Sequence, residues 1–124
     1  MISFENNTVF HLKQVDKNAF YTQVAPLLIE GEDILSAYQA GRDGIVFTTL
    51  RIFAIDVQGI VGKKIDIATL PYKHIQSFSI ENAGVGDADG ELDIILMGQK
   101  RIRFEFDKNT DIAIIGKTIS RFTL

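Results

Sequence analysis

The stretch RDGIVFTTLRIFAIDVQGIVGKKID, residues 42–66, decides the fold, because it predicts three β-strands separated by two tight turns. Its strands are rich in β-branched and aromatic residues, which favour extended backbone. The first break falls at residues 49–50. The second, at residues 56–59, ends in a glycine, which tolerates the positive φ of a chain reversal. The stretch therefore predicts architecture and almost nothing about chemistry.

The first turn sets the register of the two strands around it. A two-residue connection at Thr49 and Leu50 makes a tight hairpin. Residues directly opposite one another in such a hairpin lie on the same face of the sheet. The pairs expected here are Phe47 with Ile52 and Ile45 with Ala54.

A second hairpin, residues 92–106, allows the same argument. Each arm has three apolar residues on one face: Leu92, Ile94 and Leu96 on the first, and Ile102, Phe104 and Phe106 on the second. A loop at residues 98–100 brings these faces together, whereas a two-residue loop sets Asp93 against Phe104. The expected pairs are Leu96–Ile102, Ile94–Phe104 and the like-charged Asp93–Glu105. Burial of large apolar side chains, at roughly 1.5–3 kcal/mol each, outweighs that one repulsion.

Alternation also marks the remaining strands of a β body that extends over residues 33–106. Residues 34–38 form its expected first strand. Residues 64–70 and 75–81 alternate apolar and polar side chains, as half-buried strands do. Pro71 separates these two strands, in keeping with the confinement of proline to turns and edges.

The N-terminal lead, residues 1–31, is expected to contain a short helix. Asp16 is the expected cap, and Gly31 should end the helix. The apolar residues on one side of this helix are Phe20, Val24, Leu27 and Leu28. Residues 1–14 alternate weakly, so an extra strand, a docking arm and a frayed terminus all remain open.

A C-terminal helix is predicted over residues 109–123, where the apolar period changes from two to a 3-4-3 spacing. Its apolar stripe consists of Ile112, Ile115, Ile119 and Phe122. Asn109 is the expected cap. Gly116 interrupts the helix at a cost of about 1 kcal/mol relative to alanine, which indicates that the helix backbone approaches the sheet closely there.

Composition agrees with one small domain spanning residues 1–124. The 124 residues are 46% apolar, which is ample for a core without disulfides or metals, and the absence of cysteine excludes thiol chemistry. No apolar run is long enough for a secretory signal or a membrane span, so a cytoplasmic location is the default expectation. A net charge of −3 and a pI near 5.3 argue against nucleic-acid binding, which needs a basic face.

Three sequence patterns suggest a calcium, phosphate or metal site, but none has the spacing or neighbouring elements that such a site needs. The loop GVGDADGE, residues 84–91, is rich in aspartate but departs from the EF-hand pattern in the position of its glycine. The glycines of the same loop precede no helix, which a phosphate-binding loop needs. His11 and His74 lie far apart and have no cysteine partners. We therefore expect no catalytic residue, no metal site and no cofactor, and hence no enzyme.

Short motifs occur along the β body: Arg42-Asp43, Phe47-Thr48, Arg51, Ile55-Asp56, Gln58-Gly59, Gly62-Lys63-Lys64, Leu70-Pro71-Tyr72, Ile75, Phe78-Ser79 and Ala83-Gly84. Together they resemble the bacterial pleckstrin-homology (PH) domain family in its short single-domain form, from about Leu27 to the C-terminus. The resemblance implies a mainly β (α+β) fold, a seven-stranded, strongly bent PH-like barrel closed by the C-terminal helix. From its place at the end of the apolar stripe of that helix, Phe122 is expected to plug the open end of the barrel. The resemblance also implies no enzymatic activity and a ring-forming homo-oligomer, with a pentamer as the expected ring.

Candidate interface residues are the apolar residues expected outside the core. They are Leu50, Ile60, Val61, Ile95 and Met97. Leu50 stands on a turn where the family often has lysine, so this chain exchanges a charge for an apolar side chain. A contiguous set of outward apolar residues usually marks an interface, and PH-like barrels leave strand edges that a subunit can pair with. We therefore expect a homo-oligomeric scaffold or protein-interaction domain, with itself or another protein as partner.

Basic residues define the alternative function. Eukaryotic PH domains bind inositol phosphates on the loop between their first two strands, and the corresponding residues 38–43 hold one cation, Arg42. Lys63 and Lys64 adjoin the apolar tip of the second turn. These three residues are candidates for anion contact, in a peripheral membrane module that acts through residues 59–64. Two lysines supply only about 1 kcal/mol each at a membrane surface, so cover by a neighbouring subunit is the favoured interpretation.

Overall fold

The computed structural model describes residues 8–82, 90–98 and 100–124. Its elements, in chain order, are β1 (Thr8–Val15), α1 (Tyr21–Val24), the 3₁₀ helix η1 (Ala25–Leu27), β2 (Ile34–Ala40), β3 (Asp43–Thr48), β4 (Arg51–Gln58), β5 (Lys64–Pro71), the 3₁₀ helix η2 (Tyr72–His74), β6 (Ile75–Glu81), β7 (Gly90–Leu96), β8 (Lys100–Phe106) and α2 (Ile112–Thr123). The strands expected between residues 33 and 106 are all present. A further strand, β1, comes from the N-terminal lead.

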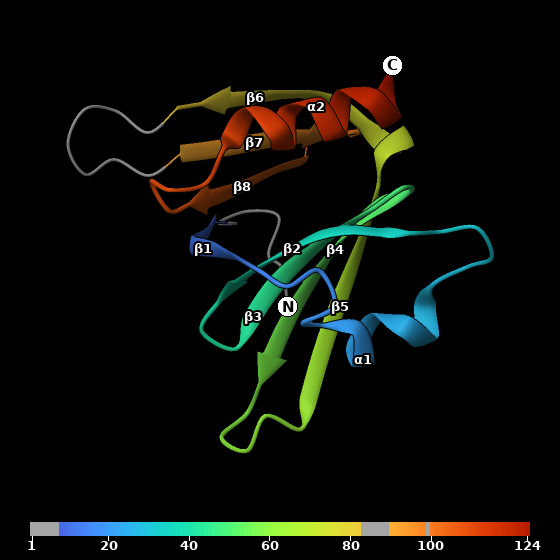
Figure 1. The fold of residues 1–124 in the computed structure, drawn as a ribbon, viewed down its shortest axis with the longest axis vertical. Helices are drawn as coiled ribbons and strands as arrows, with labels where there is room; N and C mark the ends of the chain where they lie inside the picture. The colour runs from blue at the N-terminus through green and yellow to red at the C-terminus, as the bar shows by residue number, and fades with distance from the viewer. Residues whose placement is uncertain (1–7, 83–89, 99) are drawn as a thin grey trace.

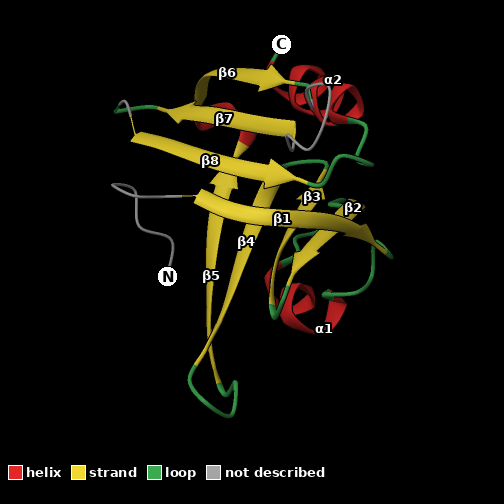
Figure 2. Ribbon diagram, turned by 90° about the vertical axis from the view of Figure 1, so that its left-hand side faces the viewer, coloured by secondary structure: helices red, strands yellow, loops and turns green. Residues whose placement is uncertain are grey.

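One continuous eight-stranded sheet has the order β5-β4-β3-β2-β1-β8-β7-β6. It bends so strongly that β6, β7 and β8 run across the direction of β4 and β5 (Figure 1, Figure 2). The strand β1 joins the two halves, because it lies antiparallel to β2 and parallel to β8. Of the alternatives left open for the start of the chain, the extra strand is therefore confirmed for residues 8–14. Residues 1–7 lie outside the described residues, as does most of the acidic loop at residues 84–91.

Two apolar clusters lie on opposite faces of the β2–β5 half of the sheet. The main core, between the two halves and closed by α2, buries Leu12, Tyr38, Ile45, Phe47, Ile52, Ala54, Leu70, Tyr72, Leu92, Ile94, Leu96, Ile102, Phe104, Phe106, Ile112, Ile115 and Ile119. The smaller cluster, on the α1 side, buries Phe20, Val24, Ala37, Val46, Phe53 and Ile55. Successive residues of a strand, such as Ile52 and Phe53, thus serve different clusters because their side chains alternate across the sheet.

The register predicted for the first hairpin is confirmed. β3 and β4 pair Phe47 with Ile52 and Ile45 with Ala54. The turn between them is held by the Thr48 hydroxyl oxygen, which accepts hydrogen bonds from the N–H groups of Leu50 and Arg51 at 3.0 and 3.1 Å. A side chain that bonds to the backbone in this way favours a tight turn.

The register predicted for the second hairpin is wrong by two residues. β7 and β8 pair as Leu92–Phe104, Ile94–Ile102 and Leu96–Lys100. A shift of two residues keeps every side chain on its expected face, so the apolar residues stay buried. The observed register sets Asp93 opposite Arg103, whose Nε–H donates to Asp93 Oδ1 at 2.9 Å. Asp93 thereby gains an ion pair, and the like-charge pair moves to Glu105 and Glu91, which face each other in this register.

The short N-terminal helix begins later than expected. α1 follows Phe20, and Asp16 instead holds a preceding turn, where its Oδ1 accepts a hydrogen bond from the Asn18 N–H at 2.8 Å. Phe20 and Val24 are buried as expected, whereas Leu27 is largely exposed. Leu28 is half-buried against the same cluster, so three of the four apolar residues expected on this side are packed.

The C-terminal helix closes the main core, but its cap differs from the prediction. Asp111, not Asn109, precedes the helix, and its Oδ1 accepts a hydrogen bond from the Ala113 N–H at 3.1 Å. Gly116 lies against β6 as expected, since a Cβ there would be 3.3 Å from Ile80 Cδ1. Among the described residues, no helix is long and apolar enough to cross a membrane.

Candidate functional site

The β4–β5 hairpin projects at the bottom of Figure 1 and ends in an apolar tip. Gly59 and Gly62 have positive φ, of 82° and 66°, and the Gly62 N–H donates to the Gly59 carbonyl at 3.2 Å. Between these glycines, Ile60 and Val61 are 102% and 74% exposed. Single exposed apolar residues are ordinary, but two adjacent ones at a projecting tip make this tip a candidate binding surface.

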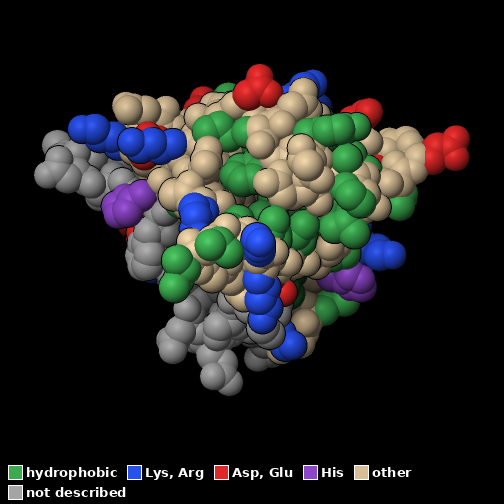
Figure 3. All heavy atoms as spheres, turned by 90° about the horizontal axis from the view of Figure 1, so that it is seen from below, with side chains coloured by type: hydrophobic (Ala, Val, Ile, Leu, Met, Phe, Trp, Pro, Cys, Tyr) green, Lys and Arg blue, Asp and Glu red, His purple; other side chains and the backbone are tan. Residues whose placement is uncertain are grey.

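A cation from a different loop joins this tip. Arg42 precedes β3, and its Nη1–H donates to the Gly59 carbonyl at 2.8 Å. The contact brings Arg42 to the hairpin that carries Lys63 and Lys64, so all three candidates for anion contact gather at one end. Seen from this end, hydrophobic and basic side chains lie next to one another near the centre, and acidic ones lie mostly toward the edge (Figure 3). Spacing alone gives no sign of the contact, because 17 residues separate its partners.

Two other candidate interface residues, Leu50 and Met97, lie next to η2. The Tyr72 N–H donates to the Leu50 carbonyl at 3.1 Å, and the Met97 N–H donates to the His74 carbonyl at 2.9 Å. The side chains of Leu50 and Met97 are 44% and 62% exposed. The fifth candidate, Ile95, is half-buried on β7. The five candidates thus fall on different parts of the surface: the hairpin tip, the η2 end and a sheet face.

A pocket of about 420 Å³ opens beside η2. Its lining, mainly apolar, consists of Ile29, Thr49, Leu50, Arg51, Pro71, Tyr72, Lys73 and Phe122. The rings of Tyr72 and Phe122 stack with centroids 5.4 Å apart and an angle of 16° between their planes. Phe122 therefore closes the edge of the core and is half-buried. No local sequence pattern marks this η2 pocket, because it forms only where the loop before β2, the β3–β4 turn, η2 and α2 meet.

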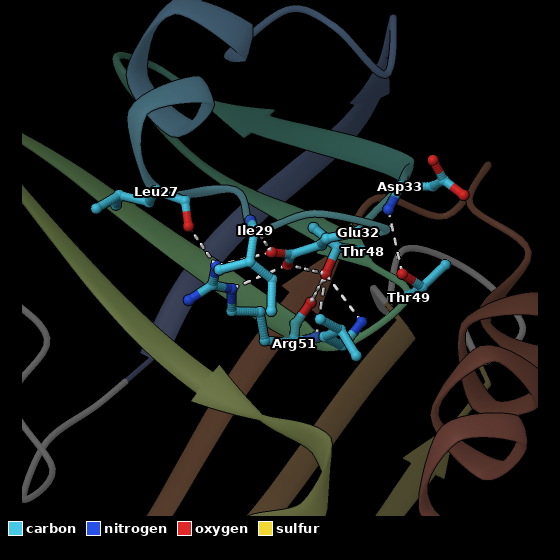
Figure 4. Close-up of polar contacts among 8 residues, drawn as sticks. Leu27, Ile29, Glu32, Asp33, Thr48, Thr49 and Arg51 are labelled. Atoms are coloured by element: carbon cyan, nitrogen blue, oxygen red, sulfur yellow. Dashed lines mark hydrogen bonds and ion pairs between the residues drawn. The ribbon is translucent and has the colours of Figure 1, made fainter.

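A buried ion pair holds Arg51, one wall of the η2 pocket (Figure 4). The Glu32 carboxylate, whose side chain is 0% exposed, accepts hydrogen bonds from Arg51 Nε–H at 2.9 Å and Nη2–H at 2.7 Å. It also accepts one from the Thr48 hydroxyl at 2.6 Å. Burial alone raises the pKa of the Glu32 carboxyl, but the hydrogen bonds from Arg51, Thr48 and the Ile29 N–H outweigh it and hold the pKa below its ordinary value. Glu32 therefore stays ionised and matches the charge of Arg51.

The Tyr72 side chain, which also lines the η2 pocket, is likewise held by a hydrogen bond within the protein. Its hydroxyl donates to the Thr48 carbonyl at 2.8 Å. Burial, and next the negative charge of Glu32, raise the pKa of the Tyr72 phenol. The phenol therefore stays protonated at neutral pH and cannot act as a base. Because these polar groups are hydrogen-bonded within the protein, the pocket presents a mainly apolar surface.

The family model and the solved structures that this chain matches are those of PH domains, in agreement with the bent sheet and its closing helix. Residues 3–123 match the model of a family described as bacterial PH domain. The chain belongs to the bacterial PH domain family. The family and the fold class predicted from the sequence motifs are thereby confirmed.

Relatives of this bacterial PH domain occur in Bacillus subtilis strain 168. The uncharacterized protein YjqA is 39% identical over 104 residues, which cover 82% of this chain and 83% of YjqA. The uncharacterized protein YozO is 35% identical over 107 residues, which cover 86% of this chain and 92% of YozO. These two relatives match this chain over most of their own length.

Two solved structures have a similar fold. A DUF1696 family protein with a pleckstrin-homology domain, from Shewanella loihica PV-4, is 36% identical with a TM-score of 0.82, covering 94% of this chain and 100% of that one. A pleckstrin homology domain from Shewanella amazonensis SB2B is 39% identical with a TM-score of 0.69, covering 89% of this chain and 90% of that one. The function of this bacterial PH domain must then be argued from its surface, because one fold serves many functions.

Proposed function

We propose that this bacterial PH domain is a non-catalytic, homo-oligomeric scaffold or protein-interaction domain. The observation that carries the proposal is the projecting β4–β5 hairpin, whose tip leaves Ile60 and Val61 exposed. Removing apolar surface from water contributes roughly 25 cal/mol per Å². A partner that covers both side chains is therefore favoured, and further copies of the same chain supply such a partner to every subunit.

The ends of the sheet support the same proposal. β5 and β6 are the first and last strands in the sheet order, so each has one side without a strand partner in the part of the chain that the structure describes. Backbone N–H and C=O groups at such an edge can pair with a strand of another molecule. The pentameric ring implied by the family resemblance is the form of assembly that we propose.

Light scattering after gel filtration tests this proposal. At micromolar concentration, we expect one discrete species with more than twice the subunit mass of 13.8 kDa. The species should persist on tenfold dilution, because buried apolar contacts hold it together. A clean monomer over the same range would refute the homo-oligomer.

A second function, docking to an anionic membrane, is favoured by the hydrogen bond from Arg42 to Gly59. That bond places a third cation beside the tip, so Arg42, Lys63 and Lys64 accompany two exposed apolar side chains. Apolar side chains flanked by cations are suited to shallow insertion among anionic headgroups, where each cation contributes about 1 kcal/mol.

Co-sedimentation with vesicles separates the two functions. Under the scaffold proposal, we expect no saturable binding to phosphoinositide vesicles at physiological salt. Micromolar binding that is lost in the double variant Lys63→Glu, Lys64→Glu would favour the membrane function instead. The double variant Lys108→Glu, Lys117→Glu, which reverses two charges at exposed positions outside the tip and the η2 pocket, is the matched control and should leave any such binding unchanged.

A further inference from the structure

We propose that the hairpin tip of one subunit, Ile60 and Val61, inserts into the η2 pocket of a second copy, so that subunits assemble head to tail. This inference rests on the proposed homo-oligomer and names the two surfaces that meet. It is carried by an exposed apolar projection and an open apolar pocket in the same chain.

The hairpin tip is built to project as a defined shape. Gly59 and Gly62 set its turn, and the Arg42 side chain is hydrogen-bonded to the Gly59 carbonyl at 2.8 Å. A Cβ at Gly62 would also lie 3.3 Å from Val57 Cγ1, so the base of the tip is closely packed. A tip held in this way loses little conformational freedom when it binds, which favours affinity.

The η2 pocket offers an apolar receptor of suitable size. Its volume of about 420 Å³ accommodates two branched aliphatic side chains, and its walls include Leu50, Pro71 and Phe122. Leu50 remains 44% exposed at the rim. Filling the pocket with Ile60 and Val61 would cover both sets of apolar surface in one interface, whereas a membrane at the tip would leave the pocket open.

The tip and the pocket cannot meet within one subunit, because they lie at opposite ends of the same two strands. The tip joins the end of β4 to the start of β5, and the pocket is lined by Arg51, the first residue of β4, and Pro71, the last of β5. Each strand has eight residues, which span roughly 25 Å at about 3.3 Å per residue. In Figure 1 the hairpin lies at the bottom and the end of α2, which carries Phe122, at the top. Contact between unlike surfaces of identical subunits generates a ring, or a filament if the ring does not close.

The charged residues nearest to the two surfaces also differ, although Asp56 and Asp66 lie farther along the hairpin and Asp43 lies beside it. The tip brings the cations Arg42, Lys63 and Lys64. At the pocket, the charge of Arg51 is already matched by Glu32. Two exposed acidic residues, Glu30 and Asp33, are near neighbours of the lining, because Glu30 follows Ile29 in the chain and the Asp33 N–H bonds to Thr49 Oγ1 at 3.1 Å. These two acids outnumber the one remaining cation of the lining, Lys73.

Two single variants and their mixture test the inference. Ile60→Glu places a charge on the tip and leaves the pocket intact. Leu50→Glu places a charge in the pocket and leaves the tip intact. Each variant alone should elute as a monomer in light scattering, with an unchanged circular dichroism spectrum. Ile114→Glu, a matched substitution of an exposed isoleucine on α2 outside the pocket lining, should keep the wild-type mass.

The mixture distinguishes a head-to-tail contact from a symmetric one. An equimolar mixture of the two monomeric variants retains one intact tip and one intact pocket, so it should form a heterodimer of twice the subunit mass and no larger species. Variants that keep the wild-type mass, or a mixture that stays monomeric, would overturn this inference and leave the proposed oligomer standing. A wild-type monomer would overturn both.

Discussion

Glu32 and Arg51 form a two-pronged ion pair that joins the loop before β2 to the β3–β4 turn. The Arg51 Nε–Glu32 Oε2 distance is 2.9 Å and the Arg51 Nη2–Glu32 Oε1 distance is 2.7 Å. The Arg51 guanidinium also lies over the Phe53 ring, 4.4 Å from its centroid. The pair therefore fixes one wall of the η2 pocket and connects the loop before β2 to the sheet.

Arg51→Met should lower the free energy of unfolding by about 3–5 kcal/mol, because it leaves the Glu32 carboxylate buried without its charge partner. Urea denaturation measures the change. Arg101→Met, at an exposed position on β8, is the matched control and should change stability by less than about 0.5 kcal/mol. Equal effects of the two substitutions would show that the buried pair has no special role.

Glu32→Gln should make stability less sensitive to acid. The pKa of Glu32 is lower in the folded protein than in the unfolded chain. The ionised carboxylate therefore stabilises the fold above about pH 4.3, the ordinary pKa of glutamate, and this contribution is lost as the pH falls through the folded pKa. The variant should be less stable than wild type at neutral pH and lose less stability between about pH 5 and pH 3. Parallel pH profiles would contradict the assignment.

Glu91→Gln is a control, because the pKa of Glu91 is shifted in the direction opposite to that of Glu32. Burial, and then the charges of Glu81 and Glu105, raise the pKa of Glu91 and outweigh the neighbouring Arg103. Its ionisation therefore opposes folding at neutral pH. The substitution should leave stability at neutral pH unchanged or slightly higher, as measured by the same urea titrations. A loss of stability like that of Glu32→Gln would mean that the two carboxylates do not differ as described.

Gly44→Ala and Gly116→Ala should differ in effect although both glycines are buried. A Cβ at Gly44 would lie 2.2 Å from Phe20 Cζ and 2.8 Å from the Tyr38 carbonyl oxygen, so α1 would have to move. We expect a loss of about 1–3 kcal/mol. At Gly116 the nearest atom, 3.3 Å away, is the end of the partly exposed Ile80 side chain, and alanine favours the helix by about 1 kcal/mol. Thermal melts of both variants measure this contrast, and a larger loss at Gly116 would contradict it.

Phe122→Ala should lower stability by about 2–3 kcal/mol, less than the 3–5 kcal/mol of a fully buried phenylalanine, because the ring is half-buried. The loss comes from its stacking on Tyr72. Differential scanning calorimetry should show a melting temperature lower by roughly ten degrees. A variant that melts within about two degrees of wild type would show that the end of α2 contributes little to closing the core.

Local patterns in the sequence predicted the strands from β2 to β8, through runs of β-branched and aromatic residues or through alternation, whereas β1 was one of three alternatives. The register of the first hairpin was also predictable, since a two-residue turn at Thr49 and Leu50 allows only one pairing of its strands. The second was not, because a slip of two residues leaves every apolar side chain on its face. The ion pair of Asp93 with Arg103 is a tertiary contact that the apolar pattern does not contain.

The candidate site was predictable only where its residues are neighbours in sequence. The tip residues Ile60 and Val61 are adjacent to Lys63 and Lys64, so their proximity needs no tertiary information. The approach of Arg42 to this tip, and the assembly of the η2 pocket from four separate segments, depend on how the sheet bends. Sequence periodicity carries no information about that bend.

Native mass spectrometry of the wild-type protein tests the central claim most directly. It resolves the number of subunits in each species without reference to molecular shape. Homo-oligomerisation predicts one dominant closed species of more than two subunits of 13.8 kDa, and five is the number expected for the ring. A spectrum dominated by the single subunit at micromolar concentration would contradict the claim.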